Sequence, residues 1–192
     1  MTMKQRIEGQ PGGRKHPVDK VRASHDGHEY HEAWVARKAL QLLWPDAELA
    51  AIAVEGLSPC DQPRASAATV EIADITLYYG QYRTFKYASR TTIVQIKYSI
   101  ANECDEFRAS HAKETIAKFA KTYLDYKDKY GPQAVKDKLD FEVITNRPMY
   151  MPLLQALDAL ARSAPQTGEA ERQSRQLKIA SGLAGCCKTD VF

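Results

Sequence analysis

Apolar residues recur every three or four positions along four stretches of the chain, and this period predicts helices. In the first stretch Tyr30 and Trp34 mark one face, four residues apart. In the second, an apolar stripe that includes Phe119 runs opposite many lysines. The predicted helices are residues 30–44, 105–130, 151–161 and 169–185.

Between these helices, apolar and polar residues alternate or form short apolar runs, which indicates β-strands. The segments "TVEIADITLYYG" and "RTTIVQIKYS" alternate, and the aromatic and basic segment between them predicts a hairpin with a long tip. The predicted strands are residues 49–56, 69–80, 90–99 and 141–146. Helices before, between and after the strands indicate an α/β sandwich.

The two ends of the chain differ in composition from its middle. Residues 1–23 are rich in Gly, Pro, Lys and Arg, and we interpret them as a flexible basic arm. Residues 24–165 are expected to form the folded core. Residues 166–192 are interpreted as a C-terminal helix that begins a following module, which would make the chain the front piece of a longer protein.

Composition excludes some classes of protein. Among the 192 residues, 44% are hydrophobic and 27% charged, as in ordinary globular domains. No apolar run is long enough to span a membrane, and the N-terminus lacks the apolar region of a secretory signal. The four cysteines follow neither a zinc nor a disulfide spacing, so we expect reduced thiols and a cytoplasmic location. A net charge of +3 permits a polyanionic partner without requiring one.

The strand "IVQIKYS" places Gln95 and Lys97 on one face, because residues two apart in a strand point the same way. If the preceding strand pairs with it as a hairpin, Asp74 faces these two residues and Glu55 approaches from the first strand. A half-buried lysine without a carboxylate partner is costly, so Asp74 is expected to pair with Lys97. The simpler alternative is a solvated sheet face that carries a surface ion pair.

Two carboxylates, an amide or carbonyl oxygen and a lysine suit a hard divalent cation such as Mg²⁺. Such a cation polarises a phosphoryl oxygen and lowers the pKa of a bound water. A nearby lysine stabilises the negative charge that develops on the phosphate. These residue types therefore favour hydrolysis of a phosphodiester.

An Asp followed one strand later by Glu/Gln-x-Lys resembles the core motif of the restriction-endonuclease-like superfamily. Here the motif reads "EIAD" and "QIK", with a leading Glu in "VEG". The ordered segments "GHEYHEAWVARKALQLL", "VEG", "EIADITL", "IVQIKYS", "FEVITNRP" and "RQLKIASGL" resemble the double-stranded-DNA nuclease domain of bacterial anti-phage effectors, including CD-NTase-associated effectors that respond to cyclic oligonucleotides. The resemblance covers about residues 25–185.

This resemblance implies a restriction-endonuclease-like mixed central sheet flanked by helices. It also implies a Mg²⁺-dependent endonuclease, with Mn²⁺ as a substitute, that cuts double-stranded DNA with low sequence specificity. The implied metal ligands are Glu55, Asp74, Gln95 and the carbonyl of Ile96. Lys97 would orient the attacking water and stabilise the transition state, and Glu32 would add an acidic group behind the ligands.

Such nucleases need a switch, so we expect either a homo-oligomer or fusion to a sensor or oligomerisation module. In the hairpin tip Arg83, Lys86 and Arg90 are predicted to bind DNA phosphates, with a solvated loop as the alternative. The histidines of "SHDGHEYHE" drift around a helix instead of forming a stripe, so we interpret them as polar contacts and not as a zinc site.

One departure from the superfamily motif leaves the activity open. Gln95 stands where many members have Glu, which removes one negative metal ligand. The chain could therefore also be a catalytically inactive restriction-like module that binds DNA or assembles with a partner. RNA as the substrate stays open as well.

Overall fold

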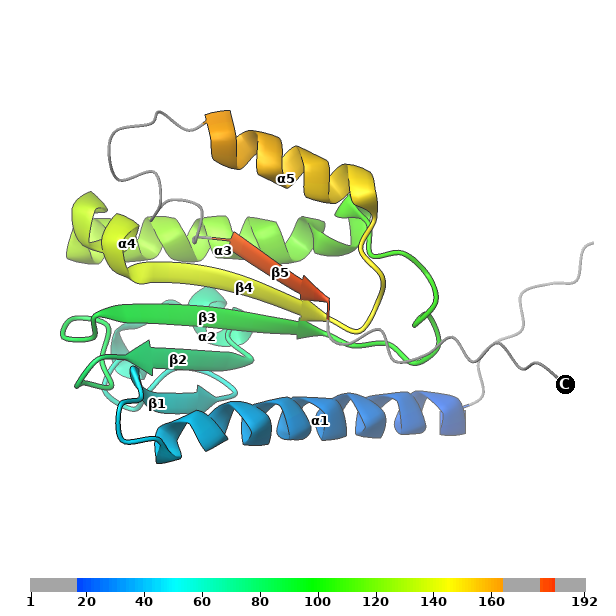
Figure 1. Ribbon diagram of the computed structural model, residues 1–192, viewed down its shortest axis with the longest axis horizontal. Helices are drawn as coiled ribbons and strands as arrows, with labels where there is room; N and C mark the ends of the chain where they lie inside the picture. The colour runs from blue at the N-terminus through cyan, green and yellow to red at the C-terminus, as the bar shows by residue number, and fades with distance from the viewer. Residues whose placement is uncertain (1–16, 164–176, 182–192) are drawn as a thin grey trace, which may run out of the picture.

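A five-stranded mixed β-sheet with helices on both faces forms the centre of the molecule (Figure 1). The computed structural model describes residues 17–163 and 177–181. The strands follow each other in the sheet in the order of the sequence: β1 (Leu49–Val54), β2 (Ile75–Tyr79), β3 (Arg90–Lys97), β4 (Leu139–Thr145) and β5 (Leu177–Ser181). The predicted α/β class is confirmed.

The first three strands are antiparallel, and β3, β4 and β5 run parallel to one another. The predicted hairpin is confirmed, since Ile75 of β2 lies opposite Val94 of β3. The carboxyl ends of the three parallel strands therefore meet at one edge of the sheet, where β2 begins. In open α/β sheets this edge is where ligands commonly bind.

Helix α1 (Pro17–Ala39) covers one face of the sheet. Its side chains Tyr30, Trp34 and Val35 pack against an apolar cluster from β1 to β4. The rings of Tyr30 and Tyr98 stack with centroids 4.4 Å apart, which fixes the helix beside the end of β3. The 3₁₀ helix η1 (Leu40–Leu43) continues α1 toward β1.

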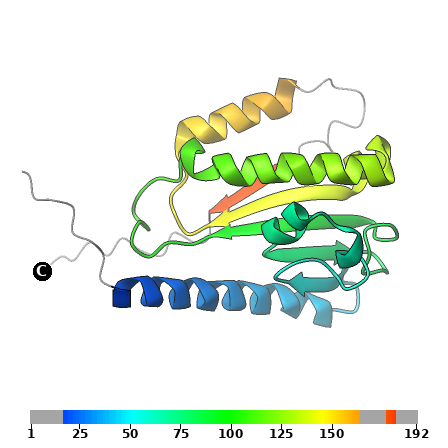
Figure 2. The same ribbon diagram turned by 180° about the vertical axis from the view of Figure 1, so that it is seen from behind.

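The opposite face carries α2 (Ala67–Ile72), α3 (Ala109–Tyr130), α4 (Pro132–Lys138) and α5 (Met151–Ser163). Figure 2 shows α2 and α3 in front of the strands. The larger apolar cluster lies here, with Phe119 of α3 stacked on Phe141 of β4 at 4.6 Å. Both faces of β3 are therefore buried, which differs from the strand with one polar face expected from its sequence.

The strand predicted over residues 69–80 is wrong in its first half, because residues 67–72 form α2. Ser66 caps this helix by accepting a hydrogen bond from the Thr69 amide at 3.2 Å. Thr69 and Ile72 are both buried, three residues apart, as on one face of a helix. Tertiary packing against α3 thus overrides the alternating pattern.

Three further differences concern the helices. Helix α1 begins at Pro17, a residue type that favours the first turn, so residues 17–23 of the expected basic arm are helical. Residues 177–181 of the expected C-terminal helix form β5, which pairs with β4 and extends the sheet beyond the expected core boundary at residue 165. The short helix α4 was not expected. Residues 1–16 and the rest of 166–192 lie outside the described residues.

The fold bears on two expectations from composition, namely the lack of a membrane span and the reduced cysteines. Within residues 17–163 and 177–181, no helix combines the length and the apolar character needed to cross a membrane. Cys60 and Cys104 are exposed and not joined in a disulfide, and the other two cysteines lie outside the described part.

Removal of the α2 cap tests its contribution to stability. We expect Ser66→Ala to lower the free energy of unfolding by about 1 kcal/mol, the usual cost of losing a helix N-cap. Urea denaturation measures this change. Ser110→Ala, an exposed serine in α3, is the control and should change stability by less than about 0.5 kcal/mol. Equal effects of the two substitutions would contradict the role of the cap.

Candidate functional site

Asp74 lies immediately before β2 and is the centre of the candidate site. Its Oδ2 atom accepts a hydrogen bond from the Ile96 amide at 2.7 Å and a second from Nε2 of Gln95. The expected proximity of Asp74 and Gln95 is thus present in the structure. Residues 67–72 form α2, however, so Asp74 reaches Gln95 from the short connection before β2 and not from within a strand.

The sheet register explains this contact. Ile75 pairs with Val94, so one step further Asp74 comes opposite Gln95. The regular strand has ended there, and the Asp74 carboxylate accepts the bond that a β2 carbonyl would otherwise take from Ile96. A strand residue directs its N–H and C=O toward the same neighbouring strand, so the Ile96 carbonyl also lies on the Asp74 side.

Glu55 reaches the site through its backbone. Its amide donates to the Asp74 carbonyl at 2.6 Å, while its side chain is exposed. Glu55 has φ of 53°, a left-handed conformation that costs a non-glycine residue about 1 kcal/mol. The Thr76 hydroxyl donates to the Gly56 carbonyl at 2.7 Å and secures this turn. Strained residues of this kind cluster at functional sites.

Lys97 ends β3 and is half-buried. The expected direct ion pair with Asp74 is absent, since no described carboxylate lies within ion-pair distance of Lys97. The lysine still acts at longer range, because its positive charge lowers the pKa of Asp74. Because Lys97 is partly exposed, water solvates its ammonium group. The desolvation cost that would require a carboxylate in direct contact therefore does not arise.

Burial raises the pKa of Asp74 above its ordinary value. The Ile96 amide, then His31, Lys97 and Gln95, oppose this rise by favouring the charged carboxylate. His31 is half-buried on α1 and was not identified from the sequence as a site residue. Its position beside Tyr30, on the helix face that packs on the sheet, is the signal that could have found it.

Glu32, the acidic residue expected from the first helix, does not join the site. Its side chain is exposed and forms no hydrogen bond or ion pair with a described residue, because successive helical residues are turned by about 100°. His31 is the α1 residue that Asp74 senses electrostatically. Helix α1 passes the carboxyl end of β3 (Figure 1), and the stacking of Tyr30 on Tyr98 places this part of the helix beside that end.

Two residues after β4 brace the other side of the site. Asn146 accepts a hydrogen bond from the Ser99 amide and donates one to the Ser99 carbonyl, both at 3.0 Å. The buried Arg147 donates to the carbonyls of Asp105 and Glu106, both at 2.9 Å. These bonds hold the chain that follows Lys97, and the sequence carries no spacing that would have revealed them.

The donor atoms at this sheet edge fit a hard divalent cation. Carboxylate and carbonyl oxygens are the ligands that Mg²⁺ prefers, and the Asp74 carboxylate and the Ile96 carbonyl are of this kind. Glu55 is bonded to Asp74 through its backbone, and its exposed side chain carries a further carboxylate. The second oxygen of Asp74 accepts no hydrogen bond from a described residue. No group of three or more His, Cys, Asp and Glu side chains is clustered for a metal within the described ranges, so the set depends on main-chain and amide oxygens.

Gln95 contributes differently from the expectation. Its amide nitrogen is bonded to Asp74, so its carbonyl oxygen is directed away from that carboxylate. A neutral donor at this position stabilises the charged form of Asp74, whereas a glutamate would repel it. In this arrangement Gln95 holds Asp74 in place.

The predicted DNA-binding residues lie at the other end of the hairpin. Arg90 begins β3 and Lys97 ends it, about 23 Å away at the rise of a β-strand. Arg83 and Lys86 are exposed in the tip beyond Arg90. These residues cannot reach a phosphate bound at Asp74, and contact with a more distant part of a duplex stays a prediction.

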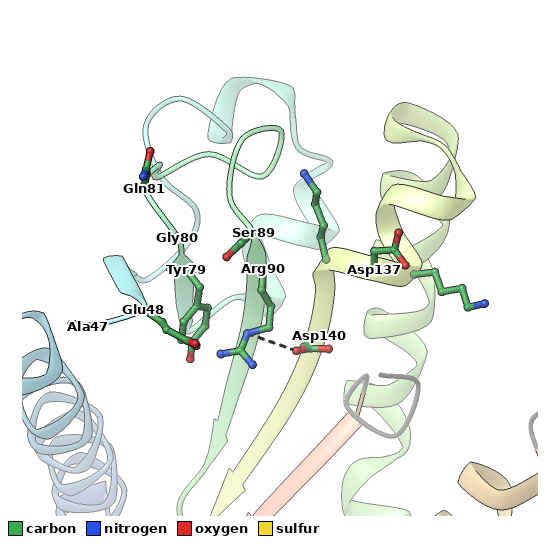
Figure 3. A pocket seen from close by; sticks show the side chains of 11 residues that line it. Ala47, Glu48, Tyr79, Gly80, Gln81, Ser89, Arg90, Asp137 and Asp140 are labelled. Atoms are coloured by element: carbon green, nitrogen blue, oxygen red, sulfur yellow. Dashed lines mark ion pairs between the residues drawn. The ribbon is translucent and has the colours of Figure 1, made fainter. Parts of the chain in front are cut away.

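Arg90 itself is turned inward. Its guanidinium lies 3.8 Å from the centroid of the Tyr79 ring, and its Nε is 4.0 Å from Oδ2 of Asp140. Figure 3 shows these groups in an open cleft of about 590 Å³ between the start of β3 and the end of α4. Acidic and basic groups are mixed along the cleft walls, so it does not concentrate positive charge.

Comparison with known proteins yields no relative: no family model matches the chain, and no curated protein matches it. Function therefore has to be inferred from the geometry and chemistry of the site.

The raised pKa of Asp74 predicts how stability depends on pH. Because the folded state holds this proton more tightly than the unfolded state, Asp74 makes stability fall as pH rises from its ordinary pKa through the raised one. We expect metal-free Asp74→Asn to be at least as stable as the parent at pH 7, with a gap that closes in acid. Thermal denaturation in EDTA from pH 3.5 to 7.5 measures this. If the stability of Asp74→Asn relative to that of the parent is lower at pH 7 than at pH 4, the predicted pH dependence is contradicted.

Proposed function

We propose that the chain is a metal-dependent nuclease domain with a restriction-endonuclease-like fold, which hydrolyses phosphodiester bonds of double-stranded DNA. The observation that supports this most is the convergence of Asp74, Gln95 and Ile96 at the sheet edge, with Glu55 bonded to Asp74 and Lys97 one residue beyond. The sheet order, with three antiparallel strands followed by parallel ones, agrees with the proposal.

Each residue of the site has a role in the proposed reaction. Mg²⁺ supplies Lewis-acid polarisation of the phosphoryl oxygen and lowers the pKa of a bound water. Asp74, Glu55 and the Ile96 carbonyl would hold the cation, while Gln95 keeps the Asp74 carboxylate oriented through its hydrogen bond. Lys97, free of a direct ion pair with a described carboxylate, stabilises negative charge on the scissile phosphate.

His31 provides a further group toward the substrate. It lies on α1, close enough to Asp74 to favour the charged form of that carboxylate, and its ring lies 6.5 Å from that of His28. An imidazole N–H in this place can donate to a phosphate oxygen. A role in anti-phage defence and fusion to a sensor module follow only from the resemblance, and a cytoplasmic location follows from the cysteine usage; all three are part of the proposal.

Cleavage assays with single-residue variants test the proposal. We expect the parent to cut plasmid and linear duplex DNA with Mg²⁺ or Mn²⁺, and Lys97→Ala and Asp74→Asn each to lose about 100-fold or more of that activity. Lys113→Ala removes an exposed lysine of α3 and should retain it. If Lys97→Ala and Lys113→Ala cut equally well, the assigned site is wrong.

The inactive DNA-binding or assembly module is the second candidate, because Gln95 supplies no negative charge. Gln95→Glu distinguishes the two candidates. A second carboxylate beside Asp74 should destabilise the metal-free protein and strengthen metal binding, so Mn²⁺ should raise the Tm of Gln95→Glu by more than it raises the parent's. Differential scanning fluorimetry over a Mn²⁺ titration measures this, with Gln155→Glu on α5 as the exposed control. Identical Mn²⁺ shifts in all three proteins would favour the inactive module.

A further inference from the structure

An exposed apolar segment stands at the end of α1, away from the candidate site. The Leu-Trp patch, as we call it, consists of Leu40, Leu42, Leu43 and Trp44. Leu43 is 75% exposed and Trp44 is 62% exposed. None of the four is buried, although a single 3₁₀ turn of this composition normally packs against a core.

The patch adjoins an open sheet edge. Strand β1 pairs with β2 on one side, and no described strand pairs with its other side. Its sequence, "LAAIAV", contains no charge and no proline, which are the usual protections of an edge strand. Val54 at its end is 55% exposed. Segment η1 contacts β1, so patch and edge form one continuous surface.

We propose that this surface is the interface through which two copies of the chain associate, with their β1 strands paired antiparallel. A two-fold axis requires a surface that is complementary to itself. The free N–H and C=O groups of an edge strand meet this requirement in the antiparallel orientation, and no side chain of β1 places like charges opposite each other.

Charges at the two ends of the patch favour a second copy over an unrelated partner. Arg37 and Lys38 precede the patch, while Asp46 and Glu48 follow it. Arg37, Asp46 and Glu48 are exposed, and none of the four forms an ion pair with a described residue. Lys38 lines one hollow together with Asp46 and Glu48 of the same copy, so Arg37 is the cation that remains for a partner. Antiparallel pairing reverses the chain direction and would bring this arginine toward Asp46 of the second copy.

The area is sufficient for a modest dimer. The patch together with Val54 exposes on the order of 500 Å² of apolar surface, within the range of about 300–600 Å² at which such patches on monomers are often functional. Two patches together bury about 1,000 Å² before the strand backbones are counted, close to the ~1,200 Å² of small specific interfaces. This inference does not depend on the proposed nuclease activity.

Sedimentation of the full chain tests the interface. The parent should sediment at twice its chain mass of 21.5 kDa at micromolar concentration, and Leu43→Asp should raise the dissociation constant about 30-fold or more, as expected for a central interface residue. Leu124→Asp changes a leucine of α3 that is 54% exposed, so it is the matched control and should remain dimeric. Unchanged circular dichroism and Tm would show that Leu43→Asp is folded.

Charge reversal gives a second readout. Arg37→Glu should weaken the dimer, and addition of Asp46→Arg in the same chain should restore it, because the proposed arrangement brings the two residues against each other across the two-fold axis. A parent that is monomeric up to about 100 µM overturns the proposal. If the β1 amides of such a monomer are protected from hydrogen exchange, a segment of the same chain covers the edge, and the proposal is overturned as well. A dimer that Leu43→Asp leaves intact overturns it too.

Discussion

The Ile96 amide donates to the Asp74 carboxylate just before β2 begins, at a point where that strand supplies no carbonyl. The buried amide of Ile96 would be costly to leave without a partner, so the side chain of Asp74 completes the ladder. The same bond sets the position of the carboxylate relative to Gln95 and Lys97. The Glu55 amide, bonded to the Asp74 carbonyl, adds the third strand to this junction. The chemistry of the site therefore depends on a structural hydrogen bond at the end of a hairpin.

The electrostatics of the site follow from this junction. Burial opposes the charge of Asp74, and uncharged donors together with two more distant cationic or polar groups compensate for it only in part. A carboxylate held in this way, with its second oxygen free of described hydrogen-bond donors, gains from the arrival of a divalent cation. Glutamine at position 95 makes this arrangement tolerable without a metal, since it replaces repulsion between two carboxylates with a hydrogen bond.

The two ends of the β2–β3 hairpin have separate chemistry. One end carries the carboxylate site, braced by Asn146 and Arg147, and the other carries the stacked Arg90 and the open cleft. The buried Asp61 accepts a hydrogen bond from the Phe85 amide at 2.8 Å and secures the tip end. Because both ends belong to the same two strands, the distance between them is fixed by strand length. Helix α1 runs along both, with His31 near the first end and the Leu-Trp patch at the second.

Strand alternation and chain order alone predicted the hairpin, the α/β class and the proximity of Asp74 to Gln95, because a strand period of two and a short connection leave few alternatives. The local sequence pattern could not predict that residues 69–72 form a helix and residues 177–181 a strand. These segments acquire their structure from packing on α3 and from pairing with β4, respectively. It also could not decide which α1 side chain approaches Asp74, or that Arg90 turns inward onto Tyr79. Those outcomes depend on contacts between residues distant in the chain, and such contacts leave no periodic trace in the sequence.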